Sequence, residues 1–123
     1  MSAADYRSFR FSCLTVNVNF ACRLHRDTGN SGVTAITTCG TYTGGALLYW
    51  PEDKGCGFTP LSQLRQEQAV ALHTRSKVAV YDGRRAHEVQ PFEGRRTSVV
   101  WCAGRGSWDA DDDLKAHLRK PGF

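Results

Sequence analysis

The stretch Arg95-Arg96-Thr97-Ser98-Val99-Val100-Trp101-Cys102 decides the fold class, because β-branched and aromatic side chains of this kind favour a β-strand. Shorter runs of similar character recur along the chain, and turn signals separate them. The candidate strands are Phe11 to Ala21, Arg23 to Asp27, Val33 to Cys39, Ala46 to Trp50, Ala69 to Thr74, Val78 to Tyr81, His87 to Pro91 and Thr97 to Cys102. The sequence therefore predicts an all-β domain.

The connections between these strands refine the prediction. Gly44-Gly45 permits positive φ in a hairpin, and Asp82-Gly83 is a strong tight-turn dipeptide. Residues 51–68 contain glycines, prolines and a polar run, which predicts an irregular loop with a short helix. Residues 107–120 place acidic side chains first and basic ones last, as suits a C-terminal helix. About eight strands favour a double-stranded β-helix, the cupin-like jelly roll.

Length and composition indicate one domain spanning residues 1–123, since a chain of 123 residues holds one hydrophobic core. Hydrophobic residues make up 41% of the chain and charged residues 23%, and no apolar stretch approaches the ~20 residues that cross a bilayer. The N-terminus has no basic region followed by an apolar core, which is the mark of a signal peptide. We therefore expect an intracellular protein, cytoplasmic or nuclear.

The five cysteines form no Cys-x-x-Cys pair, and an odd number cannot all pair within one chain. We therefore expect reduced thiols. Cys13, Cys39 and Cys102 fall in candidate strands, where a free thiol behaves as a small apolar side chain, so a structural role is favoured over a zinc or redox role. Cys56, between two glycines, is the candidate for a reactive loop thiol.

The net charge of +4 indicates a moderately basic surface. Basic pairs along the chain could meet a phosphate backbone or an acidic peptide, or could simply be solvated. The pairs are Arg23 with Arg26, Arg75 with Lys77, and Arg84 with Arg85.

Two short segments carry candidate metal ligands, His25 and Asp27 in one and His87 in the other. In an extended strand alternate side chains share a face, so His25 and Asp27 would project together while Arg26 points away. His87 follows the predicted turn at Asp82-Gly83, where a neighbouring strand would begin. Two imidazoles and a carboxylate form the ligand set of a non-haem iron(II) site with open coordination positions. Taken singly, each histidine is better explained as a surface or core residue paired with a carboxylate such as Asp27 or Glu88.

Arg96 and Ser98 share a face of the last candidate strand. A guanidinium with a hydroxyl beside it is a good receptor for a carboxylate, because arginine can bind both oxygens at once. Arg95 is the rival basic residue, but only Arg96 has the same parity as Ser98. The sequence therefore predicts a carboxylate site at Arg96 and Ser98.

In this order, His25-x-Asp27, His87 and Arg96-x-Ser98 resemble the iron(II)- and 2-oxoglutarate-dependent dioxygenases. Further strings look like the thymine and 5-methylcytosine dioxygenase group (TET/JBP-like), and similar strings occur in relatives of the prolyl hydroxylases. These strings are Val16-Asn17-Val18-Asn19, Asn30-Ser31-Gly32, Gly40-Thr41-Tyr42-Thr43-Gly44-Gly45 and Tyr81-Asp82-Gly83. The resemblance runs from about Thr15 to Trp101, which is most of the chain.

The resemblance implies a double-stranded β-helix that binds iron(II) through His25, Asp27 and His87. It also implies 2-oxoglutarate and dioxygen as co-substrates. The distal carboxylate of 2-oxoglutarate would bind Arg96, helped by Ser98, while its other end chelates the iron. Oxidation of a substrate C–H bond would accompany decarboxylation of 2-oxoglutarate to succinate.

Four further residues are candidates for the co-substrate pocket. Leu47 and Tyr49 share a strand face and could line it, with core packing as the competing explanation. Asn17 and Asn19 stand in a candidate strand, where asparagine is disfavoured. One or both could hydrogen-bond the co-substrate or fix the His25 segment.

The substrate remains open between two versions, a nucleic-acid base and a protein side chain of the prolyl type. A third alternative is a catalytically silent jelly-roll module that holds a carboxylate ligand. Members of this superfamily usually carry helices before the first barrel strand, whereas about ten residues precede that strand in this chain. We therefore expect an uncovered sheet face, with a missing N-terminal region, a partner chain or a homodimer contact to cover it.

Overall fold

The computed structural model describes residues 9–55 and 57–104, and strands dominate them. The strands are β1 (Cys13–Val18), β2 (Thr34–Cys39), β3 (Tyr42–Gly44), β4 (Leu47–Tyr49), β5 (Val70–Leu72), β6 (Ala79–Tyr81), β7 (His87–Val89), β8 (Phe92–Gly94) and β9 (Thr97–Cys102). Two short 3₁₀-helices, η1 (Leu61–Gln63) and η2 (Gln66–Gln68), lie between β4 and β5. The strand pairs are antiparallel, and the predicted all-β class is confirmed.

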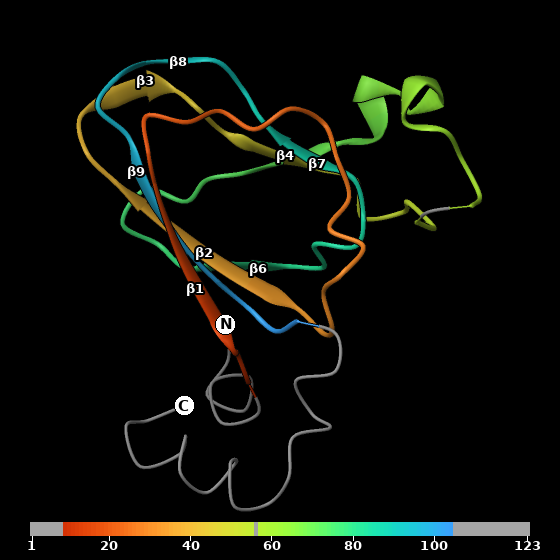
Figure 1. Cartoon of the computed structure of the whole chain (residues 1–123). Helices are drawn as coiled ribbons and strands as arrows, with labels where there is room; N and C mark the ends of the chain where they lie inside the picture. The colour runs from red at the N-terminus through yellow and green to blue at the C-terminus, as the bar shows by residue number, and fades with distance from the viewer. Residues whose placement is uncertain (1–8, 56, 105–123) are drawn as a thin grey trace, which may run out of the picture.

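The largest sheet has the order β1-β9-β2-β6 (Figure 1). Its second strand, β9, begins at Thr97 and ends at Cys102 as predicted, and it pairs with β1 on one side and β2 on the other. Ser98 is buried and the rest of β9 is half-buried, which suits the β-branched and aromatic residues of this strand. The stretch that predicts the fold class therefore lies inside the main sheet, and β1 forms one of its edges.

The second sheet has the order β5-β4-β7, and β3 pairs with β8 in a separate ribbon. The two larger sheets form two layers that meet through a buried cluster of Ile36 from β2, Leu47 from β4 and Tyr81 from β6 (Figure 1). Leu48 points to the opposite face of β4, where it packs with Trp50 and Ala86. The hydrophobic core therefore lies on both sides of β4.

The predicted strand Arg23 to Asp27 is wrong. This segment contributes one isolated bridge, between His25 and His87, instead of a ladder. Beyond the bridge, Asp27 N–H donates to the carbonyl of Gly83, and Asn30 N–H donates back to Asp27. The chain therefore turns within a few residues of His25, which leaves no length for a regular strand.

The hairpin predicted at Gly44-Gly45 is also wrong, although both glycines have the positive φ that was expected, +78° and +70°. β3 pairs with β8 and β4 pairs with β5 and β7, so this glycine pair carries the chain from one sheet to another. The sequence pattern missed β3 and β8, each of which ends in a glycine, a residue that is depleted in strands.

Other predicted connections agree better with the structure. Arg85 N–H donates to the carbonyl of Asp82 at 3.0 Å, which closes the predicted tight turn. Residues 51–68 form an irregular connection that contains η1 and η2. The C-terminal helix predicted for residues 107–120 lies outside the described residues, as does Cys56. No helix in the described part of the chain is long and apolar enough to cross a membrane.

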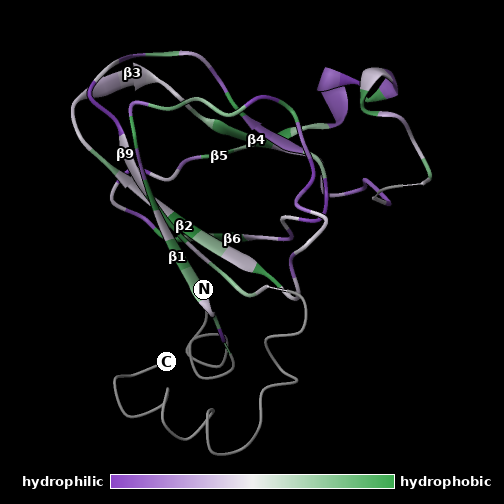
Figure 2. Ribbon diagram, in the orientation of Figure 1, coloured by the Kyte–Doolittle hydropathy of each residue, from purple (hydrophilic) through white to green (hydrophobic). Residues whose placement is uncertain are grey.

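One face of the largest sheet is apolar and exposed, and Figure 2 shows hydrophobic stretches in β1 and β2. Leu14, Val16 and Val18 of β1 are 52%, 55% and 63% exposed. Val80 of β6 is also exposed. Apolar surface of this kind often marks a contact with another surface, so coverage by a partner or a further segment stays a prediction.

Cys13, Cys39 and Cys102 lie in β1, β2 and β9, so their expected positions in strands are confirmed. Cys13 and Cys39 are nevertheless exposed, since β1 is an edge strand whose residues are mostly exposed and Cys39 is the last residue of β2. The described cysteines are free thiols. A role as small apolar core side chains therefore does not fit Cys13 or Cys39.

Candidate metal centre

His25, Asp27 and His87 come together beside the core between the two larger sheets. His87 is the first residue of β7, and His25 is its bridge partner. His25 Nε2 lies 3.2 Å from Asp27 Oδ1, and His87 Nε2 lies 3.4 Å from Asp27 Oδ2. One ligand atom from each of the three residues lies within 4.8 Å of the other two. The three side chains therefore offer two nitrogens and one oxygen to a single small cation.

Backbone carbonyls fix the orientation of both imidazole rings. His25 Nδ1 lies 2.6 Å from the carbonyl oxygen of Arg23, and His87 Nδ1 lies 2.9 Å from that of Arg85. A carbonyl oxygen only accepts hydrogen bonds, so each Nδ1 must carry the proton. Each ring is therefore oriented so that Nε2 faces Asp27, and an Nε2 atom that gives up its proton would present its lone pair to a metal.

Short backbone contacts hold the three residues in place. His25 and His87 exchange N–H to carbonyl hydrogen bonds of 3.1 Å each, and Asp27 N–H donates to Gly83 at 2.8 Å. A Cβ at Gly83 would lie 3.1 Å from Asp27 Oδ2, so the absence of a side chain lets the Asp82–Arg85 turn approach the carboxylate closely. The side chain of His87 is 3% exposed, whereas those of His25 and Asp27 are 38% and 36% exposed. The cluster is therefore anchored on one side and open on the other.

The charges of the cluster are strongly coupled. Hydrogen bonding to Asp27, and then to Cys22, raises the pKa of His25 to about 10. Burial alone would raise the pKa of Asp27, but the hydrogen bonds from His25 and His87 outweigh it and hold that pKa well below its usual range. The proton on His25 Nε2 therefore lies between that nitrogen and Asp27, where a bound metal ion would contact both.

Metal binding is accordingly expected to release a proton. Because the pKa of His25 is raised to about 10, this residue is protonated at neutral pH and must lose its proton when Nε2 binds a metal. Affinity should therefore rise about tenfold per pH unit between pH 6 and 9. Calorimetric titration with iron(II) in buffers of different ionisation enthalpy measures the released proton directly. Metal binding with no proton release and no pH dependence would contradict this assignment of His25.

A cavity of about 270 Å³ connects the cluster with most of the predicted co-substrate residues. The three candidate ligands lie in its wall together with Arg96 and Ser98 of the opposite sheet. Asn17 and Leu47 also line the cavity. The structure therefore brings a possible metal site and a possible carboxylate site into one cavity.

Arg96 is a buried cation that forms no ion pair with the residues that the structure describes. Its side chain is 2% exposed, and within the described residues neither Nε nor Nη2 has a hydrogen-bond partner. The guanidinium carbon lies 5.6 Å from the ring centre of Tyr42 and 5.8 Å from that of Phe92. Burying unpaired donors costs free energy unless a ligand satisfies them. An anion in the cavity would satisfy these donors.

Asn17 and Asn19 have different places in this structure. Asn17 Nδ2 donates to Ser98 Oγ at 3.3 Å across the β1–β9 pair, inside the cavity. Asn19 does not line the cavity; its Oδ1 accepts from Arg96 N–H at 2.9 Å, and its own N–H donates to the Arg96 carbonyl. Asn19 has a φ of +53°, which asparagine tolerates better than most residues. It therefore fixes the backbone from which Arg96 enters the cavity.

Leu47 and Tyr49 also differ. Leu47 lines the cavity and belongs to the buried core, so its position is compatible with either predicted explanation. Tyr49 lies outside the cavity lining, where its hydroxyl accepts from Asp82 N–H at 3.3 Å and its ring packs on Tyr81. Tyr49 therefore supports the turn that approaches Asp27.

Tyr81 and Thr34 are among the residues of the cavity wall to which the sequence gave no role. The ring of Tyr81 stands edge-on to the His87 ring, with 5.1 Å between ring centres, and burial raises its pKa above the usual range. Thr34 is buried and accepts a hydrogen bond from Asn30. The position of Tyr81, just before the predicted Asp82-Gly83 turn that leads to His87, was a signal that could have identified it. No sequence signal marks Thr34.

Comparison of the chain with protein-family models and with curated proteins finds no match. The assignment of the site depends on its own chemistry. That chemistry is a cluster of two imidazoles and one carboxylate, with a buried guanidinium in the same cavity.

Proposed function

We propose that this protein is an iron(II)- and 2-oxoglutarate-dependent dioxygenase that oxidises a C–H bond of its substrate. One observation carries the proposal. A buried guanidinium with unsatisfied nitrogens, that of Arg96, shares a cavity with the His25, Asp27 and His87 cluster. Iron(II) is a cation that two imidazoles and a carboxylate can bind. 2-Oxoglutarate is an anion that Arg96 can bind.

The donor set fits the metal. Two Nε2 atoms and one carboxylate form the 2-His-1-carboxylate set typical of non-haem iron(II), which leaves coordination positions free for other ligands. Iron, when bound, would supply the dioxygen chemistry, and the protein positions the partners. The side chains of His25 and Asp27 are partly exposed, so iron and the co-substrates could reach the site from its open side.

The cavity also fits the co-substrate. Its volume of about 270 Å³ is slightly below the range of about 300–1,000 Å³ that holds drug-sized ligands, which suits a small dicarboxylate. The distal carboxylate would accept hydrogen bonds from Arg96, and the hydroxyl of Ser98 lies in the same wall. Asn17, which donates to Ser98, would hold that hydroxyl in place.

The strand order supports a jelly-roll architecture for the proposed enzyme. With the His25 bridge beside β7 counted as a short strand, each of the two facing sheets contains four strands. Two facing antiparallel sheets of four strands are the arrangement of a jelly roll. The ribbon of β3 and β8 would then close one end beside Arg96.

Gly45 tests the packing around Arg96. A Cβ at Gly45 would lie 3.1 Å from both Cδ and Nε of Arg96, and its φ of +70° disfavours other residues. We expect Gly45→Ala to lower the free energy of unfolding by about 1–2 kcal/mol and to weaken 2-oxoglutarate binding. Urea denaturation and calorimetry measure the two effects. Gly29→Ala is the control, since a Cβ there meets nothing within 4 Å; equal effects in both variants would contradict the proposed packing.

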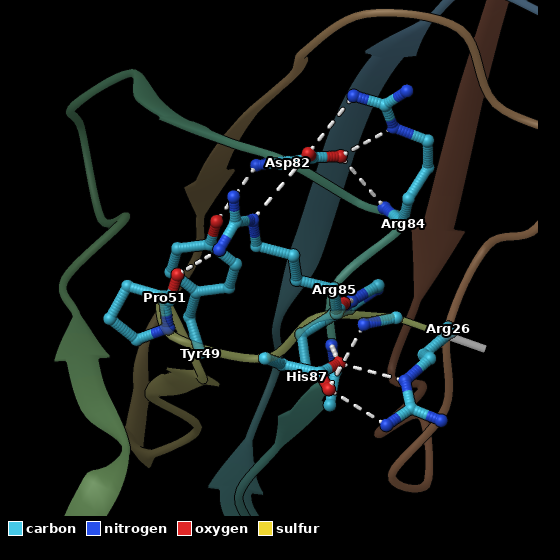
Figure 3. A network of polar contacts seen from close by, with 10 residues as sticks. Arg26, Tyr49, Pro51, Asp82, Arg84, Arg85 and His87 are labelled. Carbon is cyan, nitrogen blue, oxygen red and sulfur yellow. Dashed lines mark hydrogen bonds and ion pairs between the residues drawn. The ribbon is translucent and has the colours of Figure 1, made fainter. Parts of the chain in front are cut away.

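A groove whose lining includes Thr28, the residue after Asp27, supports an anionic substrate. It has a volume of about 550 Å³, and its lining includes Lys54, Phe58, Arg84 and Arg85. Arg84 and Arg85 share a single carboxylate, that of Asp82 (Figure 3). Positive charge next to Phe58, whose side chain is largely exposed, resembles a platform on which a nucleic-acid base stacks. This favours the nucleic-acid version of the substrate over the protein side chain.

Salt dependence separates the two substrate versions. A labelled single-stranded oligonucleotide is expected to bind at low salt, with an affinity that falls steeply as salt rises. Lys54→Ala should weaken this binding and make it less salt-sensitive, while Lys77→Ala, an exposed lysine that does not line the groove, should not. Absence of oligonucleotide binding at low salt would leave the protein side chain as the substrate.

The competing function is a catalytically silent module that holds a carboxylate in the same cavity. Succinate formation separates it from the enzyme. Incubation with iron(II), 2-oxoglutarate and dioxygen should yield succinate with the wild-type protein and not with Asp27→Ala. A folded wild-type protein that binds 2-oxoglutarate but forms no succinate, with oligonucleotide or peptide present, would support the silent module.

A further inference from the structure

Cys13 and Cys102 face each other across the edge of the largest sheet. Cys13 begins β1, Cys102 ends β9, and the two are direct partners in the antiparallel register. Directly opposed residues in antiparallel strands have Cα atoms about 4.5–5.5 Å apart. This range lies within the Cα separations of about 4.4–6.8 Å that disulfides span. The backbone therefore already holds the two residues at a separation that a disulfide can bridge.

The two thiols also lie on the same face of the sheet. Asn17 and Ser98 are partners in the same pair of strands, and their side chains meet in a hydrogen bond of 3.3 Å. Cys13 precedes Asn17 by four residues and Cys102 follows Ser98 by four, so both cysteines share the face of that contact. Cys102 also lines the cavity with Asn17 and Ser98, whereas Leu14 is exposed on the opposite face. The two thiols therefore lie opposite each other on one face of the β1–β9 pair.

The two thiols differ in accessibility. Cys13 is exposed on an edge strand, while Cys102 is partly buried. Burial, and then the neighbouring Cys13 thiol, raises the pKa of Cys102 to about 11, so Cys102 stays protonated at neutral pH. A soluble oxidant would therefore react first at Cys13, and Cys102 would be the second thiol.

We propose that Cys13 and Cys102 are a modification site at which a peroxide forms a reversible cross-strand disulfide. Cys13 sulfur attacks the peroxide, which breaks the O–O bond and gives a sulfenic acid and water. Cys102 sulfur then attacks the Cys13 sulfur, the S–S bond forms, and the hydroxyl group leaves as a second water. The two thiols lose two electrons and two protons in total, and one hydrogen peroxide is reduced to two waters. A dithiol reverses the reaction.

The disulfide would fasten the edge strand that closes one wall of the cavity. β1 contributes Thr15 and Asn17 to that wall, and β9 contributes Ser98 and Val100. A link between the ends of these strands would close a loop running from residue 13 to residue 102, and long loops give large stabilisation. The oxidised protein should therefore melt about 5–15 °C higher than the reduced protein.

The test uses the whole chain, reduced and then treated with hydrogen peroxide. Non-reducing peptide mass mapping should find the Cys13 peptide joined to the Cys102 peptide, with the loss of two hydrogens. The melting temperature should rise and return to its starting value after dithiothreitol. Cys13→Ser should abolish both changes, while Cys39→Ser, which removes an exposed strand thiol opposite Thr97, should leave them intact.

Mapping of the wild-type protein decides the outcome even if a variant fails to fold. Oxidation of Cys13 to sulfinic acid with Cys102 still reduced would overturn the proposal. So would a disulfide that joins other cysteines or two chains. None of these results depends on iron or 2-oxoglutarate, so failure of this inference leaves the proposed enzyme untouched.

Discussion

Arg96→Leu is expected to weaken 2-oxoglutarate binding about 100-fold without destabilising the protein. The wild-type guanidinium is buried and two of its nitrogens have no partner among the described residues. Replacing a buried, unpaired charge by an apolar side chain removes a desolvation cost, so stability without ligand should be unchanged or higher. A bound carboxylate, in contrast, would lose its charge-assisted hydrogen bonds. Anaerobic calorimetry and urea denaturation measure the two quantities.

Arg95→Leu is the matched control, because Arg95 is the adjacent arginine and is exposed. It should leave both the affinity and the free energy of unfolding close to wild-type values. A structural role for Arg96 would give the opposite pattern. Arg96→Leu would then lower stability and leave the affinity for 2-oxoglutarate unchanged, which would contradict its assignment as the anion receptor.

His87→Ala is expected to reduce iron(II) affinity by more than about 100-fold, since loss of outer-shell partners alone costs about 10–100-fold. His87 is 2% exposed and its ring contacts His25 and Tyr81, so the variant should also lose about 1–3 kcal/mol of unfolding free energy. Equilibrium dialysis under anaerobic conditions measures the metal, and circular dichroism checks the fold.

His73→Ala is the control for this experiment. His73 is exposed and lies outside the cluster, so its variant should bind iron(II) like the wild type. Equal losses in the two variants would mean that the measured binding does not occur at the His25, Asp27 and His87 cluster. Asp27→Asn provides a second check, because it removes the charge of the carboxylate and keeps its size.

The position of β9 is predictable because its signal is local. Residues 97 to 102 are β-branched, aromatic or small, and such side chains favour a pleated, half-buried surface wherever the strand pairs. Parity also predicts that Arg96 and Ser98 share a face, and both residues are buried. The same local reasoning fails at Arg23 to Asp27, because the bridge between His25 and His87 depends on a segment far along the chain.

His25 and Asp27 do lie close together, as expected, but for a different structural reason. Strand alternation predicts that they point the same way, but the chain has no strand there. The structure instead holds the His25 ring through the carbonyl of Arg23 and the Asp27 backbone through Gly83. These contacts come from loop geometry, which periodicity does not describe.

The environment of Arg96 could not be predicted from its neighbours in sequence. Tyr42 and Phe92, the aromatic rings near its guanidinium, come from β3 and β8, whose pairing the sequence did not indicate. The space for its side chain depends on the missing Cβ of Gly45. The motif indicates which arginine matters, and the tertiary structure places its guanidinium beside aromatic rings, where two of its nitrogens have no hydrogen-bond partner among the described residues.

Anaerobic titration of the metal-free protein with iron(II) and then 2-oxoglutarate tests the central claim most directly. We predict a weak visible charge-transfer band from the chelated complex, lost in His87→Ala and weakened in Arg96→Leu. The band requires the metal and the 2-oxoacid to bind together, which is what the shared cavity is proposed to allow. A folded wild-type protein that gives no band at saturating iron(II) and 2-oxoglutarate would contradict the account.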